Sequence, residues 1–593
     1  MPPIQLLGTG MYIRRLCVAI LTLFFTVSAL ADADQDFIAL MDEAWQAELA
    51  NSPLFASRLG DRRYNQLWED LSISAIEARQ QQTRSFLRRT YAIEKSALSE
   101  AQQLNYELFR RTLQDTADAF QFNAHLMPLH HRGGAQNLEN NTNYLSFESI
   151  QDYDDWLVRM SKIGDYIDQT IKLAELGRKA GYLPPKVLMQ RIPDQIAVQL
   201  VKNIEDSPFF QLFATLPASI SNQEQGRLRA TARDTIESVV VPAYQKLDRY
   251  FNDTYLPASR DSIGLSALPN GSAWYENLTR YYTTTQMPPD DVHDLGLSEV
   301  RRIRDEMEQI IDEVDFEGSF NDFLVFLRSD PQFYFDNADD LYEAYLATSK
   351  RIDPELVNLF GKLPRMPYGV KPIPDSIAPD TTTAYYSRPA ADGSRAGTYW
   401  VNLYRPDVRP KYEIEVLTVH EAMPGHHLQI ALQQELGDMP NFRRYGGFTA
   451  FVEGWGLYSE SLGYDLGLYK DPYSRFGQLT YDMWRAVRLV VDTGMHYKGW
   501  TRQQAIDFFK DNAAKTELDI VNEIDRYIGN PGQALAYKVG QLRMQTIRQR
   551  AEVALGDAFD VREFHDELLG AGALPLDLLE RRMDDWISNV KAD

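Results

Sequence analysis

Apolar residues recur at three- and four-residue spacing along most of this 593-residue chain, and no other feature constrains its fold as much. Charged residues occupy the opposite face in each of the clearest windows, which are Asp36–Leu49, Ala75–Leu104, Trp156–Leu176, Arg227–Asn252 and Leu297–Val314. One face of an α-helix repeats with this period, so the windows predict amphipathic helices packed around an apolar core. We therefore expect a mainly α protein.

The helical pattern is interrupted about two-thirds of the way along the chain. Lys362–Pro379 carries five prolines in eighteen residues, which excludes a helix because proline lacks an N–H and clashes with the preceding turn. Just beyond it, Ala396–Leu403 has the aromatic and β-branched content of a strand. The proline-rich run is either a domain boundary or a covering loop. We expect one large helical domain over residues 32–593, with a mostly helical half at 32–360 and a second half at 361–593.

The first 31 residues differ from the rest of the chain. Arg14 and Arg15 precede the short apolar run Leu16–Val27, and the small residues of Ser28–Ala31 follow. This order is typical of a secretory signal peptide, and the apolar run is short for a bilayer span. Cleavage after residue 31 and export to the periplasm or the medium are therefore favoured over an N-terminal membrane anchor. After cleavage we expect no stable membrane insertion.

Composition narrows the chemistry of the mature chain. The single cysteine, Cys17, lies inside the leader, so neither a disulfide nor a thiolate ligand is expected, and any metal must be bound by His, Asp or Glu. The formal net charge of −23 opposes binding to phosphate backbones, so nucleic acid is not an expected partner. The sequence contains neither a P-loop nor a GxSxG motif.

Three of the nine histidines lie close together in HEAMPGHH, which runs from His420 to His427. In the HExxH pattern, histidines at i and i+4 bind zinc and the glutamate acts on metal-bound water. Here the later histidines stand at i+6, which points about 120° away on a regular helix, and at i+7, which lies about 10 Å further along the axis. We expect Pro424 and Gly425 to form a bulge, within a helix over Ile414–Leu436, that brings a later histidine back to His420.

A second motif, EGWGLYSE, begins at Glu453, 33 residues after His420. This separation allows a turn and a returning helix, and Gly454 and Gly456 would let the two helices approach closely. A carboxylate is the usual third zinc ligand where cysteine is absent. The alternatives are a salt-bridged glutamate and a hydrogen-bonded histidine network without metal. The coincidence of two unusual motifs favours the metal site.

HEAMPGHHLQ followed by EGWGLYSE resembles the signature of a large bacterial secreted family of formerly unknown function, of the gluzincin type of zinc metallopeptidases. Its distant relatives are the angiotensin-converting-enzyme-like, thimet oligopeptidase and Taq carboxypeptidase families. The resemblance covers most of the mature chain and is strongest from Thr383 to Met583. It implies a zincin-like helical protein with a deep cleft and a small β-sheet next to the HE-motif helix. It also implies that the strand Tyr399–Leu403 lies along the cleft as an edge for substrate backbone.

The resemblance also implies roles for individual residues. His420 would be a ligand of one Zn²⁺ per chain, Glu421 the general base and Glu453 the third ligand. The two-residue insertion leaves His426 and His427 as candidates for the second histidine ligand. We favour His426, because the Gly-His order then matches that of the relatives.

Supporting residues are predicted further along the chain. Three polar residues recur every four positions and so share one face of a helix: Arg488, Asp492 and His496. Asp492 would orient His496, and His496 would donate to the oxyanion of a tetrahedral intermediate; the alternative is an ordinary charged face. Tyr537 is the candidate phenol donor, and Arg526 or Arg543 would bind a substrate carboxylate.

Together these patterns predict an exported zinc-dependent metallopeptidase that hydrolyses peptide bonds, mainly of short peptides. Glu421 would act as general base, with His496 and Tyr537 as supporting donors. The alternatives are a metal-binding or substrate-binding protein of the same fold without turnover, and a zinc hydrolase of another amide or ester. Endopeptidase, carboxypeptidase and dipeptidase activity are all left open, as is the oligomeric state.

Overall fold

A computed structural model describes residues 33–592, apart from 375–377, 379–381, 391–392 and 394. The predicted signal peptide, residues 1–31, lies outside the described residues. Over the part of the chain that is described, the protein is mainly α, with one three-stranded sheet. The prediction of a mainly helical fold is confirmed.

The first half of the chain is almost entirely helical. It begins with helical residues 33–51. The helices that follow are α2 (Pro53–Arg58), α3 (Ile73–Tyr91), α4 (Glu100–Ala119), α5 (Ile150–Met160), α6 (Ile163–Ala180), α7 (Lys186–Met189), α8 (Ile192–Ala197), α9 (Pro208–Ala214), α10 (Asn222–Thr235), α11 (Val241–Tyr250), α12 (Leu256–Ala258), α13 (Gly271–Thr283), α14 (Pro289–Glu313), α15 (Phe320–Ser329) and α16 (Ala338–Ile352).

The second half contains the sheet and then returns to helices. The strands are β1 (Tyr368–Pro372), β2 (Ala384–Ser387) and β3 (Gly397–Val401). The helices are α17 (Ile414–Glu421), α18 (His426–Glu435), α19 (Asn441–Arg444), α20 (Thr449–Leu462), α21 (Pro472–His496), α22 (Arg502–Asn512), α23 (Glu517–Gly529), α24 (Ala536–Leu555), α25 (Val561–Leu569) and α26 (Leu576–Ala592).

Two of the predicted helical windows are divided in the structure. Ala75–Leu104 covers nearly all of α3 and the start of α4, and Trp156–Leu176 spans α5 and α6. The apolar spacing continues across each short connection because both helices of a pair turn an apolar face toward the protein interior. The predicted strand is confirmed as β3, and the proline-rich run before it contains β1.

The sheet has the strand order β1-β3-β2, with β3 parallel to β1 and antiparallel to β2. β3 is therefore the central strand, and both of its backbone edges are paired. The expectation that this strand would offer a free edge to substrate is wrong. The edges of the sheet are β1 and β2, and β2 contacts α17.

α21 lies between the two large apolar clusters of the protein. Met483 and Val487 join the cluster built mainly by α5, α6, α10, α11, α14 and α22. Tyr481 and Leu489 join the other cluster, built by α13, α16, the sheet, α17, α20 and α24–α26. Most of this 25-residue helix is consequently buried. Its polar side chains need partners within the protein, because burial removes them from water.

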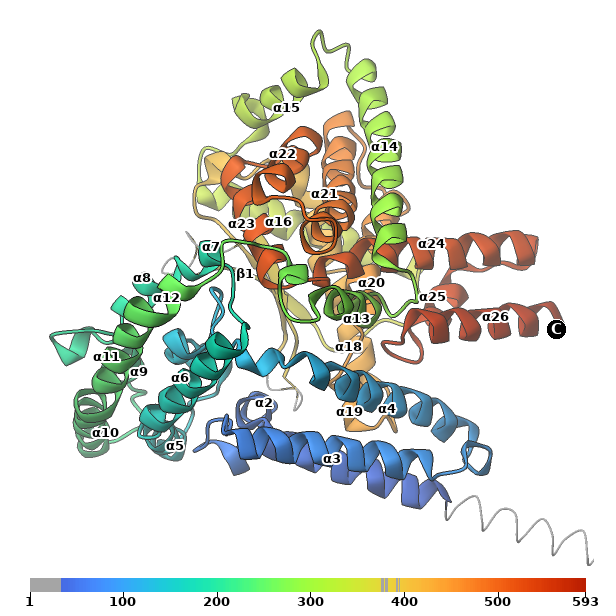
Figure 1. Ribbon diagram of the computed structural model, residues 1–593. Coiled ribbons are helices and arrows are strands. Elements are labelled where there is room, and N and C mark those ends of the chain that lie inside the picture. Colours follow the sequence, from blue (N-terminus) through green and yellow to red (C-terminus); the bar gives the residue numbers. More distant parts are fainter. Residues whose placement is uncertain (1–32, 375–377, 379–381, 391–392, 394, 593) are drawn as a thin grey trace, which may run out of the picture.

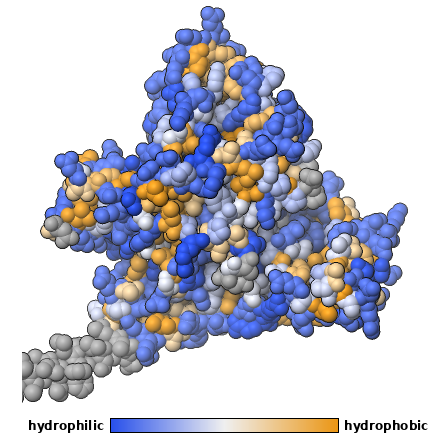
Figure 2. Space-filling view, turned by 180° about the vertical axis from the view of Figure 1, so that it is seen from behind, coloured by the Kyte–Doolittle hydropathy of each residue, from blue (hydrophilic) through white to orange (hydrophobic). Residues whose placement is uncertain are grey.

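Figure 1 shows how these elements are arranged in space. α5–α12 form a lobe at the left, α3 and α4 run along the base, and the orange and red helices of the second half fill the centre and right. Figure 2 shows a mostly hydrophilic face from behind, with hydrophobic residues in separate patches. None of the helices within the described ranges is both long and apolar enough to cross a bilayer.

Candidate metal centre

The histidine motif occupies a break between two helices. α17 ends at Glu421, α18 begins at His426, and residues 422–425 form the connection. The expectation of one bulged helix over Ile414–Leu436 is therefore wrong. The chain leaves the helix entirely for four residues, so the direction of the second histidine is set by where α18 starts.

Pro424 and Gly425 account for this break. Pro424 has no N–H to continue the helix. Gly425 packs so closely on the end of α17 that an added Cβ would lie 1.9 Å from the carbonyl oxygen of His420. From α20, the Trp455 indole N–H donates to the Pro424 carbonyl at 2.9 Å. The sequence analysis assigned Trp455 no role, although it stands inside the EGWG motif.

The break brings three possible metal ligands together. His420, His426 and Glu453 each offer one ligand atom, and these atoms lie within 4.8 Å of one another. The Glu453 Oε2 is 3.5 Å from the His426 Nε2 and 4.0 Å from the His420 Nε2. Both histidine side chains are largely buried, whereas 20% of the Glu453 side chain is exposed. The cluster is therefore enclosed on the histidine side and reaches solvent at Glu453.

His427 faces away from this cluster. Its Nδ1 lies 2.8 Å from the Tyr386 hydroxyl, and its Nε2 lies 3.0 Å from the Met366 carbonyl oxygen. Successive residues of a helix point about 100° apart. The adjacent histidines are thus divided between two surroundings: His426 joins His420 and Glu453, while His427 contacts the sheet region.

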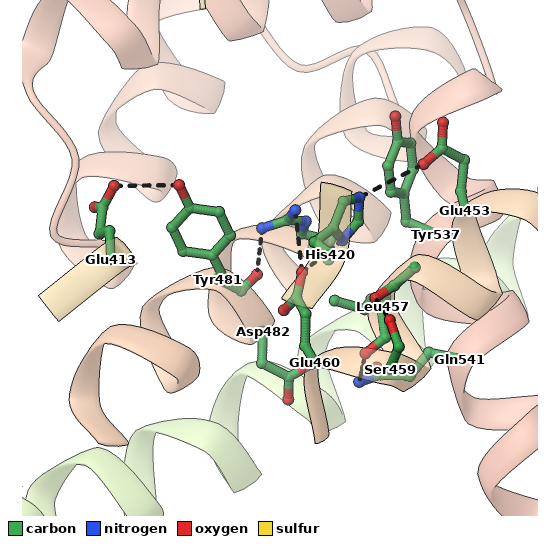
Figure 3. Close-up of polar contacts among 12 residues, drawn as sticks. Glu413, His420, Glu453, Leu457, Ser459, Glu460, Tyr481, Asp482, Tyr537 and Gln541 are labelled. Carbon is green, nitrogen blue, oxygen red and sulfur yellow. Dashed lines mark hydrogen bonds and ion pairs between the residues drawn. The ribbon is translucent and has the colours of Figure 1, made fainter. Parts of the chain in front are cut away.

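A second carboxylate orients His420. The His420 Nδ1 lies 2.8 Å from Glu460, and the Arg485 guanidinium lies 3.3 Å from the same Glu460 oxygen (Figure 3). An imidazole that binds a metal through one nitrogen commonly donates its other N–H to a carboxylate. The sequence analysis missed Glu460 and Arg485. The available signal was the position of Glu460 seven residues after Glu453, which places both on one helix face.

The two glycines of EGWG face different neighbours. A Cβ on Gly456 would lie 2.9 Å from the His420 Cε1 and 3.2 Å from the His426 Cε1. Gly454 instead packs against Gly540 of α24, where a Cβ would lie 2.6 Å from its Cα. Gly456 therefore leaves room beside the two imidazoles, and Gly454 lets α20 and α24 approach closely.

The charges of the cluster depend on one another. Burial, with a further contribution from His426, holds the pKa of His420 well below its ordinary value. Burial opposes the charged forms of His426 and Glu453 as well. Their hydrogen bond and the opposite charges nearby together outweigh burial, so that the pKa of His426 is raised and that of Glu453 is lowered. His420 is thus neutral, which is the form of imidazole that binds metals, and Glu453 is ionised. Burial also raises the pKa of Glu460 to about 8.

Glu421, the predicted general base, lies at the end of α17 beside the cluster. Its carboxylate accepts a hydrogen bond from the backbone N–H of Tyr386 in β2. Burial, and then the charge of Glu453, raise the pKa of Glu421 above its ordinary value, against the effect of His426. A carboxylate with a raised pKa is a stronger base at neutral pH.

His496 does not have the predicted oxyanion role. The Leu265 backbone N–H lies 3.0 Å from its Nδ1, and the Tyr527 carbonyl oxygen lies 3.0 Å from its Nε2. Both ring nitrogens are therefore engaged, and the side chain is fully buried. Asp492 accepts a hydrogen bond from the Tyr275 hydroxyl and does not orient His496. The expected pair is wrong because each member has another partner in the core.

Tyr537 lies where a phenol donor was expected. Its hydroxyl is 3.3 Å from the Arg526 Nη2, and the Arg488 guanidinium stands 4.4 Å from its ring centroid. In Figure 3 its side chain lies beside Glu453. Its role as a donor to substrate stays a prediction.

Comparison with known proteins gives the fold a context. A family model described as "Bacterial protein of unknown function (DUF885)" matches residues 53–583. The solved structure of a candidate lipoprotein from Colwellia psychrerythraea is 28% identical, with a TM-score of 0.87 over 94% of this chain and 99% of that chain. A candidate lipoprotein of unknown function from Shewanella oneidensis is 18% identical, with a TM-score of 0.72 over 93% and 99%. The search of curated proteins found no match.

Proposed function

Because this chain belongs to the bacterial DUF885 family, whose function is unknown, we propose its function from the site itself: it is an exported zinc-dependent peptidase. The observation that carries this proposal is the convergence of His420, His426 and Glu453, with Glu421 beside them. Two imidazoles and one carboxylate form a ligand set of zinc hydrolases that leaves one position open.

The distances support zinc as the ion. Ligands about 2 Å from a tetrahedral zinc lie roughly 3.4 Å apart, close to the 3.5 and 4.0 Å that separate Glu453 from the two histidine nitrogens. Gly456 leaves the space, and Glu460 presents the Nε2 of His420 toward Glu453. A bound Zn²⁺ would supply Lewis-acid activation of water and of a carbonyl group.

Glu421 carries the proton transfers in this proposal. It accepts a proton from the attacking water and delivers it to the leaving amine, as a general base and then a general acid. The backbone N–H of Tyr386 holds its carboxylate, and its raised pKa suits both steps. Tyr537, beside Glu453, donates a hydrogen bond to the developing oxyanion.

β2 offers the backbone edge that β3 does not. It is an edge strand, and its Tyr386 N–H already reaches Glu421. An extended peptide bound along β2 would bring a main-chain carbonyl close to the catalytic glutamate.

The leader pattern over residues 1–31 supports export to the periplasm or the medium. The descriptions of the two similar solved proteins as candidate lipoproteins favour the same location. Two other functions remain as alternatives: a binding protein without turnover and a hydrolase of another amide or ester. The experiment with Glu421→Gln described next also tests them.

Glu421→Gln tests the proposal. The zinc-loaded variant should retain its metal, because Glu421 is not a ligand, and should hydrolyse a mixed peptide pool about 1000-fold more slowly than the wild type. Mass spectrometry of the pool and metal analysis measure the two effects. Glu415→Gln, on the same helix but paired with Arg351, is the matched control and should keep its activity.

Two results would contradict the proposal. If Glu421→Gln hydrolyses peptides as fast as the wild type, Glu421 is not the base. If the zinc-loaded wild type cleaves no peptide in a broad pool, the protein is not a peptidase. It is then a binding protein without turnover or a hydrolase of another amide or ester.

A further inference from the structure

Three arginine side chains from distant parts of the chain converge beside the candidate metal centre. Arg488 comes from α21, Arg526 from α23 and Arg132 from the connection between α4 and α5. Arg488 and Arg526 contact a single carboxylate, Glu523, and the charge of Arg132 also acts on it. Three guanidinium groups against one carboxylate leave two positive charges unbalanced within this group.

The contacts of Glu523 define the group. Its carboxylate lies 3.2 Å from the Arg488 Nη2 and 3.4 Å from the Arg526 Nη1, and it accepts a hydrogen bond from the Tyr527 hydroxyl at 2.7 Å. Although burial opposes ionisation, Arg526, Arg488 and Arg132 hold the pKa of Glu523 at about 2. Two arginines thus contact this carboxylate, and a third acts on it without an ion pair.

A backbone hydrogen bond positions Arg132 near Glu523. Its N–H donates to the Nδ1 of His130, and the His130 Nε2 lies 3.1 Å from the Gly529 carbonyl oxygen at the end of α23. A Cβ on Gly529 would lie 2.7 Å from that imidazole, so the close approach requires glycine. The Arg132 side chain is exposed, and it forms no ion pair within the described part of the chain.

Arg488 is the buried member of the group. Only 2% of it is exposed, and its Nη1 has no hydrogen-bond partner within the described part of the chain. A buried guanidinium nitrogen without a partner is costly. An anion bound beside it would satisfy this nitrogen and balance the excess charge.

The group adjoins the metal centre through Tyr537. Arg526 lies within hydrogen-bonding distance of the Tyr537 hydroxyl, and Arg488 covers the Tyr537 ring. Both arginines also lower the pKa of Glu453, and Figure 3 places Tyr537 beside Glu453. An anion held by these arginines would therefore lie close to the ligand carboxylate.

We propose that Arg132, Arg488 and Arg526 form a subsite that binds the free C-terminal carboxylate of a peptide, so that the protein cleaves near the C-terminal end of its substrate. The inference rests on the peptidase function proposed above. Guanidinium groups match carboxylates in a bidentate geometry. Because an extended chain spans about 3.5 Å per residue, a carboxylate bound beside Tyr537 would belong to a residue only a few positions after the cleaved bond.

The other arginine considered from the sequence, Arg543, does not belong to the subsite. It lies six residues after Tyr537 on α24, which turns it about 120° away, and it pairs with Glu580 at 2.7 Å. Arg543 is half-exposed, like Arg526, and therefore provides a matched control.

Two pools of the same random pentapeptides, one with free C-termini and one amidated, test the subsite. The zinc-loaded wild type should cleave the free-acid pool about 100-fold faster, because amidation removes the charge that the arginines bind. Arg526→Gln and Arg132→Gln should each slow cleavage of the free-acid pool and lower the ratio of free-acid to amide cleavage at least tenfold. Arg543→Gln should behave as the wild type.

Equal cleavage of both pools by the wild type would overturn the subsite and leave the peptidase function standing. Preferential cleavage of amidated peptides that carry an internal Asp or Glu would also overturn the C-terminal assignment, because the arginines would then bind a side chain.

A binding measurement keeps the test independent of turnover. Calorimetry on the Glu421→Gln protein should show free-acid pentapeptides binding at least tenfold more tightly than their amides, and Arg526→Gln introduced into that protein should abolish the difference. If the wild type hydrolyses no peptide but free acids still bind more tightly than amides, the peptidase function is contradicted and the subsite stands. Equal binding of acids and amides would overturn the subsite.

Discussion

The segment α17–α18 and the helix α21 each carry a set of polar residues that the sequence suggested would act together. In the first segment the side chains meet at one point, whereas along α21 they stay apart. α17 and α18 are short and separated by four residues, and His420 and His426 meet Glu453 at that separation. α21 runs unbroken for 25 residues, and its regularly spaced residues lie along its length.

Regular spacing places side chains on one face but does not bring them together. Arg488 and His496 are eight residues apart, which is about 12 Å along a helix. Arg488 contacts Glu523 near the candidate metal centre, whereas His496 bonds to the Leu265 and Tyr527 backbones. A break in a helix can instead turn two neighbouring side chains toward one point. Three experiments test this contrast.

The largest effect is expected from removing a ligand histidine. His420→Ala and His426→Ala should each weaken zinc binding about 1000-fold or more, whereas His427→Ala should weaken it less than tenfold, because the two ring nitrogens of His427 bond to Tyr386 and Met366. Zinc titration with a competing chelator measures all three. Loss of zinc in His427→Ala with retention in His426→Ala would reverse the assignment.

Closing the break should have an intermediate effect. Pro424-Gly425→Ala-Ala should favour a continuous helix and turn His426 away, lowering zinc affinity about 100-fold while helicity is kept or rises. The space beside Gly425 cannot accept a Cβ without movement. Gly437→Ala, where a Cβ meets nothing within 4 Å, is the control. Unchanged zinc affinity in the double variant, measured alongside circular dichroism, would show that the break does not position His426.

The smallest effect on the site is expected from α21. His496→Gln should change zinc affinity and hydrolysis less than twofold, since both His496 nitrogens are occupied by backbone groups. Its effect should appear in stability, because burial lowers the pKa of His496 to about 4. A tenfold loss of hydrolysis by this variant at neutral pH would show that His496 does act in the reaction.

The direction of the pH effect follows from proton uptake. An unfolded histidine has a pKa near 6.5 and binds more protons than the folded one between pH 6.5 and 4, so stability falls as pH falls through this range. His496 contributes about 3 kcal/mol to that loss. Denaturant unfolding at about pH 6.5 and about pH 4 should show a smaller loss of unfolding free energy for His496→Gln than for the wild type. An equal loss in both proteins would contradict the assigned pKa.

The general character of the site could be predicted from the sequence because it rests on residue types and short spacings. The predicted loss of Cys17 with the leader would restrict metal ligands to His, Asp and Glu, and the HE and EGWG motifs indicated His420, Glu421 and Glu453. The structure places these three side chains near one another. Helical periodicity predicted the fold class in the same way, because it depends only on neighbours within two turns.

The local pattern was insufficient where the outcome depended on where an element ends or what packs against it. It predicted a bulged helix around Pro424 and an oxyanion role for His496, and the family resemblance implied an edge role for the strand now seen as the central β3. Each outcome depends on a partner from elsewhere in the chain, such as Trp455, β1 or the Tyr527 carbonyl.

The sequence by itself determined that the chain is mainly helical, that its candidate metal ligands are histidines and carboxylates, and that two motifs carry them. Only the tertiary structure decided that His426 joins the cluster, that Glu460 and Arg485 support it, and that the charge of Arg132 acts on Glu523. Hydrophobic periodicity indicates which face of a helix or strand is apolar. The meeting of Arg132 with Arg526 depends on the packing of a connection against the end of α23 across nearly 400 residues, and no local spacing encodes that contact.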